Sequence, residues 1–232
     1  MKFLKNNYFI KEIQGNLLSE LADIIIKNEG VHLIKKKTDL FSRSSCNKRI
    51  YGLFSQNNLE YFTFIYYSCK IPTSIKEILA TQESTPFKTV TFYSINKTIS
   101  GTSNSKQGAG LGLGKELIQR VSALSVQEFP EIEITCTLSP IIGFSGKSIQ
   151  EATDYLLKEK NGIFAKDPVA NFHFRNGAQF YKIVDKADSD PKRSGGLMVN
   201  YYYPACPKKL FSNSTNYLQK GIIERSESLI NN

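Results

Sequence analysis

The stretch between residues 87 and 138 constrains the fold most, because strand and helix signals alternate there around a glycine-rich run. Residues 87–95 are rich in β-branched and aromatic side chains, which is typical of a strand. Apolar residues then recur at helical spacing: Leu113, Leu117, Val121 and Leu124. Pro130 ends the predicted helix, and residues 132–138 return to a strand pattern. The order strand, glycine-rich turn, helix, strand predicts an α/β fold.

The rest of the chain continues this alternation. Apolar residues between Leu17 and Ile25 recur at helical spacing and predict an amphipathic helix within the first thirty residues. Two strand-like runs, 50–54 and 61–69, flank the turn signal Gln-Asn-Asn and predict a hairpin. Further expected elements are helices over 72–79, 148–160 and 215–230 and strands over 180–184 and 197–203.

Composition limits the class of protein. A chain of 232 residues that is 41% hydrophobic can bury one substantial core, so we expect a single domain. The net charge of +9 favours anionic partners. Lysines are spread along the chain without a dense basic arm, so we expect no nucleic-acid partner, and no stretch is long enough to cross a membrane. Four cysteines without a CxxC pair support neither a metal site nor a disulfide framework, which favours a reducing, cytoplasmic location.

The glycine-rich run is a candidate phosphate-binding loop. A glycine turn before a helix presents free backbone N–H groups and the positive end of the helix dipole to an anion. The candidate binding residues are Gln107, Gly108, Ala109, Gly110, Leu111 and Gly112. A flexible loop is the alternative for any isolated glycine-rich stretch. A Rossmann motif fits less well, because that motif follows the first strand of its fold.

Two polar residues are candidates for chemistry. His173 is one of only two histidines and lies in the polar run 167–178, which Pro168 opens. An imidazole exchanges protons near neutral pH, although His173 between two phenylalanines also suits the edge of a core. Ser139 precedes Pro140 at the end of a predicted strand, a position that suits either a ligand-binding side chain or an ordinary turn.

Several segments, in this order, resemble the catalytic region of the malonyl-CoA decarboxylase family. They are Thr-Val-Thr-Phe-Tyr-Ser-Ile-Asn at 89–96, the glycine run at 107–114, Thr-Leu-Ser-Pro-Ile-Ile-Gly-Phe at 137–144, Pro-Val-Ala-Asn-Phe-His at 168–173 and Asn-Tyr-Tyr-Tyr at 200–203. With weaker matches, the resemblance covers roughly residues 30 to 225. Separated matches in one order are more specific than any single motif.

The resemblance implies a fold and a reaction. It implies a single GNAT-like domain over residues 1–232, with a mixed, mainly antiparallel sheet flanked by helices. The run 107–112 would then hold the pyrophosphate of coenzyme A, while Ser139, His173 and Tyr203 would occupy the active site. Malonyl-CoA would lose carbon dioxide and give acetyl-CoA through a thioester enolate, with no cofactor. Asn171 and Asn200 would orient the histidine and tyrosine, or cap local turns.

The sequence departs from the family in three places. Gly112 stands where related enzymes carry a functional glutamate, and the catalytic match begins near residue 30, so we expect a compact form without the family's amino-terminal helical domain. Only residues 145–166 separate the serine and histidine motifs, a shorter stretch than is usual. A noncatalytic acyl-CoA-binding homologue and a GNAT-type acyltransferase therefore stay open as alternatives, and oligomerisation is not predicted.

Overall fold

The computed structural model describes residues 8–56, 58–82, 84–99, 112–188, 190 and 192–226. Its helices are α1 (Gly15–Asn28), α2 (Lys37–Phe41), α3 (Ile75–Ala80), α4 (Leu113–Glu128), α5 (Ile149–Lys158), α6 (Pro168–Arg175) and α7 (Pro207–Lys220). Its strands are β1 (Tyr8–Glu12), β2 (Lys48–Ser55), β3 (Asn58–Ser68), β4 (Thr89–Lys97), β5 (Ile134–Thr137), β6 (Ser139–Pro140), β7 (Lys160–Asn161), β8 (Phe164–Ala165), β9 (Gln179–Val184) and β10 (Met198–Tyr203).

Within these residues, eight strands form one mixed sheet. The order is β1-β2-β3-β4-β5-β10-β6, and β9 pairs with β10. Every pairing in this sheet is antiparallel except that of β4 with β5. Strands β7 and β8 form a separate small hairpin. The predicted mixed, mainly antiparallel α/β architecture is confirmed.

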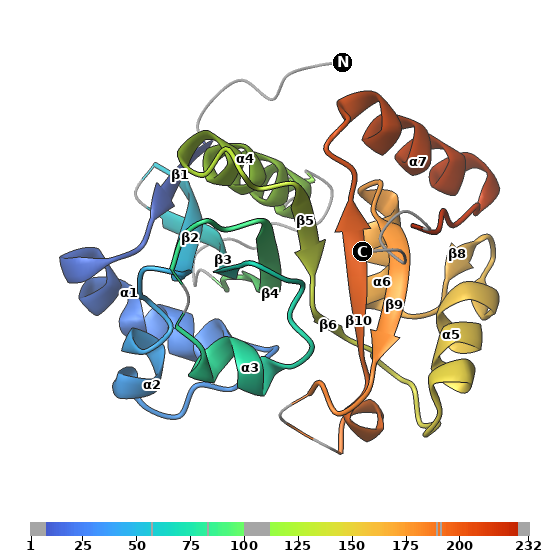
Figure 1. Cartoon of the computed structure of the whole chain (residues 1–232), viewed down its shortest axis with the longest axis horizontal. Coiled ribbons are helices and arrows are strands. Elements are labelled where there is room, and N and C mark those ends of the chain that lie inside the picture. The colour runs from blue at the N-terminus through green and yellow to red at the C-terminus, as the bar shows by residue number, and fades with distance from the viewer. Residues whose placement is uncertain are drawn as a thin grey trace.

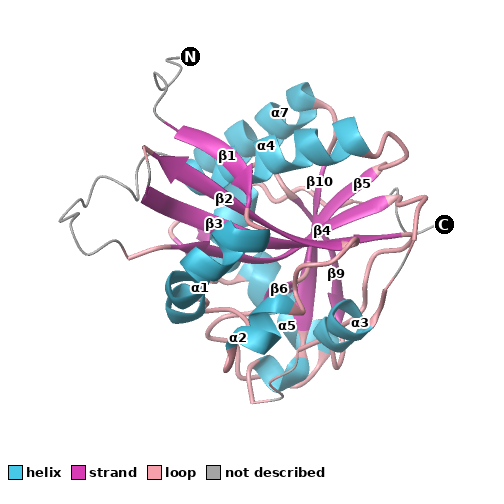
Figure 2. Cartoon of the chain, turned by 90° about the vertical axis from the view of Figure 1, so that its left-hand side faces the viewer, coloured by secondary structure: helices cyan, strands magenta, loops and turns pink. Residues whose placement is uncertain are grey.

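Helices cover both faces of the sheet. Helices α4 to α7 contribute to one hydrophobic cluster, while α1, α2 and α3 contribute to a second. Figure 1 shows α1, α2 and α3 grouped beside β2, β3 and β4, and α5, α6 and α7 grouped beside β9 and β10. Figure 2 shows α1 and α4 on opposite sides of β2 and β3.

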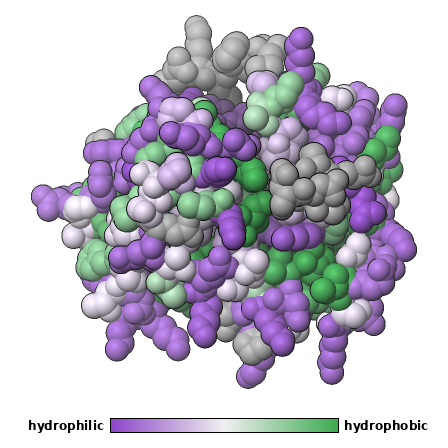
Figure 3. Space-filling model, in the orientation of Figure 1, coloured by the Kyte–Doolittle hydropathy of each residue, from purple (hydrophilic) through white to green (hydrophobic). Residues whose placement is uncertain are grey.

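Strand β3 shows how the sequence produces these two layers. Ile65 and Tyr67 lie in the first cluster, and Phe64 and Tyr66 lie in the second. Because successive side chains of a strand point to opposite faces, a continuous apolar run is buried on both sides. Outside these cores, most of the face seen in Figure 3 is hydrophilic, and hydrophobic residues gather near its centre and lower right.

Most elements predicted from the sequence are confirmed, including α1, the β2–β3 hairpin, α3, β4, α4, β5, α5, β9 and β10. The predicted helix over 215–230 is wrong in its limits. Helix α7 begins at Pro207. It ends at Lys220 because Gly221 takes a left-handed conformation with φ of 67°. Residues 227–230 of that prediction lie outside the described residues.

Candidate active site

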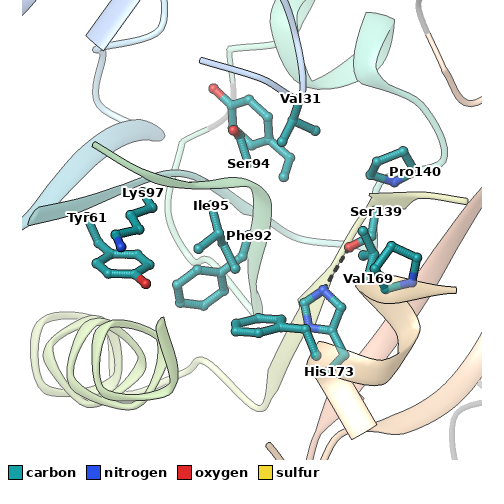
Figure 4. Close-up of a pocket in the computed structure, with 13 residues that line it drawn as sticks. Val31, Tyr61, Phe92, Ser94, Ile95, Lys97, Ser139, Pro140, Val169 and His173 are labelled. Atoms are coloured by element: carbon teal, nitrogen blue, oxygen red, sulfur yellow. Dashed lines mark hydrogen bonds between the residues drawn. The ribbon is translucent and has the colours of Figure 1, made fainter. Parts of the chain in front are cut away.

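A cavity opens where β4 and β5 separate. These parallel strands pair from Thr89 and Ile134 as far as Phe92 and Thr137. Beyond that point β4 stays paired with β3, whereas Ser139 of β6 pairs with Val199 of β10. Strand β4 therefore diverges from β5 and its continuation β6, and a cavity of about 350 Å³ lies between β4 and β6. Its walls are mostly apolar, and Ser139 and His173 both line it (Figure 4).

The cavity has two distinguishable ends. Tyr61 and Lys97 lie at one end, close to the start of α4, where the rings of Tyr61 and Phe172 approach Gly114. Val31 and Pro140 lie toward the other end, on the side of Ser139 (Figure 4). A ligand whose phosphates sit at the N-terminus of α4 would therefore extend toward Ser139 and Val31.

Local sequence signals place His173 at this cavity. The carboxylate of Asp167 caps α6 by accepting a hydrogen bond from the amide of Ala170, and Pro168 occupies the first turn. Asp167 also accepts from the amide of Ile142, at 2.5 Å, and so ties α6 to the segment after Ser139. Burial raises the pKa of Asp167 to about 6. The inward face of α6 consists of Ala170, His173 and Phe174.

A series of hydrogen bonds joins three elements at His173. The Tyr203 hydroxyl lies 2.8 Å from His173 Nδ1, and His173 Nε2 lies 3.2 Å from Ser139 Oγ. Ser139 in turn donates to the hydroxyl of Thr137 at 2.9 Å. Since the Ser139 hydroxyl donates its hydrogen bond to Thr137, its oxygen accepts one from a protonated Nε2, and Nδ1 accepts from Tyr203.

Burial keeps these groups neutral. It lowers the pKa of His173 to about 3 and raises the pKa of Tyr203, so imidazole and phenol are both uncharged near neutral pH. The Tyr201 ring stacks on the imidazole at a centroid distance of 4.5 Å. His173 is thus a neutral hydrogen-bond donor whose ring is fixed from behind by two tyrosines.

This arrangement differs from a nucleophilic serine triad. In a triad, a carboxylate accepts a proton from Nδ1 and stabilises the imidazolium that forms when serine attacks. Tyr203 is a neutral phenol that donates to Nδ1, so it offers no such stabilisation. The site is suited instead to stabilising a developing oxyanion, once the Ser139 hydroxyl turns from Thr137 and the Nε2–H of His173 turns from Ser139 toward it. In the described part of the chain, no group of three His, Cys, Asp or Glu side chains is placed to bind a metal ion.

The sequence-predicted site residues lie in different positions relative to the cavity. Ser139, His173 and Tyr203 come together, but Tyr203 is buried behind the imidazole and does not line the cavity. Asn200 donates to the carbonyl oxygen of Thr137 and so supports the strand that precedes Ser139. Asn171 points away, toward α7 and its own helix: its side-chain oxygen accepts hydrogen bonds from Tyr217 and Arg175.

The predicted phosphate loop is described only at its end. Gln107, Gly108, Ala109, Gly110 and Leu111 lie outside the described residues. Gly112 is exposed, has φ of 64° and directly precedes the first residue of α4. A left-handed conformation there favours glycine over a residue with a side chain. Residues 107–111 therefore stay a predicted coenzyme A-binding segment.

Two residues that the sequence did not single out complete the site. The Thr137 hydroxyl accepts a hydrogen bond from Ser139, and the Tyr201 ring stacks on His173. Thr137 lies two positions before Ser139, and Tyr201 lies two positions before Tyr203. Side chains two positions apart along a strand lie on the same face of the sheet. This period-two spacing was the available signal.

Comparison with known proteins identifies the family of the chain. A family model described as the malonyl-CoA decarboxylase C-terminal domain matches residues 8–152 and 147–232. The chain belongs to this family. The two matches meet inside the segment between Ser139 and His173, where the sequence predicts a shortened connection.

Similar proteins define how far the relationship extends. Mitochondrial malonyl-CoA decarboxylase from Anser anser anser is 26% identical in an alignment of 284 residues with gaps, and the alignment covers 91% of this chain and 55% of that protein. A malonyl-CoA decarboxylase structure from Agrobacterium vitis has a TM-score of 0.83 at 21% identity and covers 98% of this chain and 67% of that one. The GNAT-like decarboxylase GphF, in complex with isobutyryl-CoA, has a TM-score of 0.61 at 17% identity and covers 84% and 98% of the two chains. The predicted GNAT-like fold is confirmed.

These comparisons leave the whole enzyme's properties open. The chain spans about half the length of the curated relative that it matches. That relative is named as mitochondrial, and the cytoplasmic location of this chain stays a prediction. No helix of the described residues is long and apolar enough to cross a membrane.

Proposed function

We propose that this chain decarboxylates malonyl-CoA to acetyl-CoA and carbon dioxide, using Ser139 and His173 at the cavity between β4 and β6. The observation that carries the proposal is the hydrogen-bonded series from Tyr203 through His173 to Ser139, whose last two members face a mostly apolar cavity. Membership of the malonyl-CoA decarboxylase family supports the choice of substrate.

The cavity suits a coenzyme A thioester. The N-terminus of α4 offers backbone N–H groups to phosphate, and Lys97 adds a positive charge at the same end. The net charge of +9 attracts a ligand that carries several phosphate charges. The pantetheine arm would then pass the rings of Tyr61 and Phe172 and bring the thioester to Ser139 and His173.

The reaction uses the thioester as its own electron sink. When the bond between C2 and the carboxylate carbon breaks, its electron pair moves onto the thioester oxygen and carbon dioxide leaves. The resulting enolate oxygen is stabilised by the Ser139 hydroxyl and the Nε2–H of His173. One of these two neutral donors then gives its proton to C2, which yields acetyl-CoA and leaves that donor as an anion. A proton from solvent restores the neutral donor after product release. Apolar walls favour the reaction because they solvate a localised carboxylate poorly.

A turnover assay with the purified chain tests this proposal. We expect malonyl-CoA to yield carbon dioxide and acetyl-CoA in equal amounts. Binding of coenzyme A without release of carbon dioxide would contradict the proposal and favour a noncatalytic acyl-CoA-binding homologue. Transfer of an acetyl group from acetyl-CoA to an added amine, again without decarboxylation, would favour a GNAT-type acyltransferase.

A further inference from the structure

We propose that Val31 sets the size of the acyl group that this site accepts, and that a buried frame built on Glu29 holds Val31 in place. The proposal rests on the proposed function for the direction in which the thioester lies. It predicts a preference for the unsubstituted malonyl ester over esters with a substituent at C2.

One half of the frame is the Glu29 carboxylate, which lies just after α1 and is only 3% exposed. It accepts hydrogen bonds from the amides of Val31 and His32 at 2.8 and 2.7 Å. Ser94 and Asn96 of β4 donate to the same carboxylate at distances between 2.8 and 2.9 Å. A carboxylate held by four donor groups fixes the segment after it against the strand that forms one cavity wall.

The other half of the frame holds the same segment from the opposite direction. Arg193 donates to the carbonyl oxygen of Val31 at 2.7 Å, and Arg43 donates to that of His32 at 3.0 Å. The guanidinium of Arg193 is itself fixed by the buried carboxylate of Asp188, at 2.5 and 2.8 Å. Both N–H and C=O groups of Val31 and of His32 are therefore bonded within the protein.

A fixed backbone makes the Val31 side chain a hard limit. Its β-branched side chain has one strongly restricted torsion, so it neither rotates away nor retreats with its backbone. Val31 lines the cavity from above in the view of Figure 4, away from Tyr61 and Lys97. Because the thioester lies at Ser139 and His173, the acyl carbons beyond it extend toward Val31. A methyl group on C2 would then meet this side chain.

Binding of the product esters tests the limit without requiring turnover. Calorimetry gives the affinities of acetyl-CoA and propionyl-CoA, which differ by the one methyl group that methylmalonyl-CoA adds. Val31→Ala should shift the ratio of the two affinities about tenfold toward propionyl-CoA, since one methylene in a fitted pocket is worth roughly that factor. Val31→Ile should shift the ratio in the opposite direction.

A neighbouring residue provides the matched control. Leu33 is on the same segment but is 80% exposed and does not line the cavity, so Leu33→Ala should leave the ratio unchanged. An unchanged ratio in both Val31 variants would overturn the proposal. If the esters bind with the expected ratios but malonyl-CoA is not turned over, the proposed function fails and the size limit stands.

The frame is tested by positioning variants. Glu29→Gln keeps the shape of the side chain, but an amide nitrogen in place of Oε2 cannot accept from Asn96, and Ser94 keeps only Oε1 as an acceptor. Arg193→Gln removes the donor to the Val31 carbonyl. In either variant that remains folded by thermal melting, the affinity ratio should move in the direction of Val31→Ala, while free coenzyme A binds within about twofold of the parent. A wild-type ratio in a folded variant, beside an altered ratio in Val31→Ala, would overturn the role of the frame.

Discussion

Replacement of Tyr203 by phenylalanine tests the hydrogen-bonded series through its most deeply placed member. The Tyr203 hydroxyl is the donor to Nδ1 of the buried His173, at 2.8 Å. Its removal leaves that nitrogen without a partner in the described residues, which costs about 2 kcal/mol of folding free energy. It also removes the contact that favours the Nε2–H form of the ring. If that preference is worth about 1–2 kcal/mol, kcat should fall about 5- to 30-fold.

Steady-state kinetics with malonyl-CoA and urea unfolding measure the two effects separately. We expect kcat to fall with little change in KM, because the phenol does not line the cavity. Tyr202→Phe is the control, since Tyr202 points to the opposite face of β10 and is only partly buried. A Tyr203→Phe variant with wild-type kcat would refute the reasoning. The reasoning would also be refuted if activity fell only in proportion to the amount of folded protein.

Three further predictions follow from burial and backbone geometry. Burial lowers the pKa of His173 to about 3, so kcat should vary less than about twofold between pH 5 and 8, and a titration near pH 6.5 in the pH–rate profile would contradict this. Burial raises the pKa of Asp167 from 3.8 to about 6, so the unfolded chain loses this proton at a lower pH than the folded chain does. As pH rises from about 3.8 to about 6, the stability of wild type relative to Asp167→Asn should therefore fall by about 3 kcal/mol, as measured by urea unfolding at each pH. Gly177 follows α6 with φ of 86°, and a Cβ there would overlap the carbonyl oxygen of Leu210, so Gly177→Ala should lower the folding stability by at least about 3 kcal/mol. Gly162 has φ of 62° and no atom within 4 Å of such a Cβ, so Gly162→Ala should lower it by about 1 kcal/mol. Equal losses of stability in the two thermal melts would contradict the overlap.

Local patterns predicted most of the regular structure. The helical repeat of α4 and the turn between β2 and β3 depend on neighbouring residues, and both elements are confirmed. The short elements were missed. Among the described residues, strand β1 pairs only with β2 at the edge of the sheet, and β6 has two residues whose strand character comes from pairing with distant β10. The limits of α7 were misplaced because the roles of Pro207 and Gly221 as its first residue and its C-cap were not recognised.

Site residues that belong to a sequence motif could be predicted. Residues whose role depends on packing between distant segments could not. Motifs singled out Ser139, His173 and Tyr203, and the structure brings their side chains together. The sequence assigned no role to Glu29, whose partners Ser94 and Asn96 lie more than 60 positions away along the chain. It also suggested that Asn171 orients the histidine or caps a local turn, whereas that side chain faces α7 because its position on α6 points outward from the cavity. Such contacts join elements that lie far apart in the sequence, which no short pattern encodes.

The most direct test of the central claim compares malonyl-CoA turnover by wild type and by His173→Asn, with coenzyme A affinity measured on the same samples. We expect wild type to release carbon dioxide and the variant to lose at least about a hundredfold in kcat, because the imidazole acts only on the enolate and its protonation. Coenzyme A should bind the variant within about threefold of wild type, since phosphate recognition lies at the other end of the cavity. Wild-type turnover in a folded His173→Asn variant would contradict the claim.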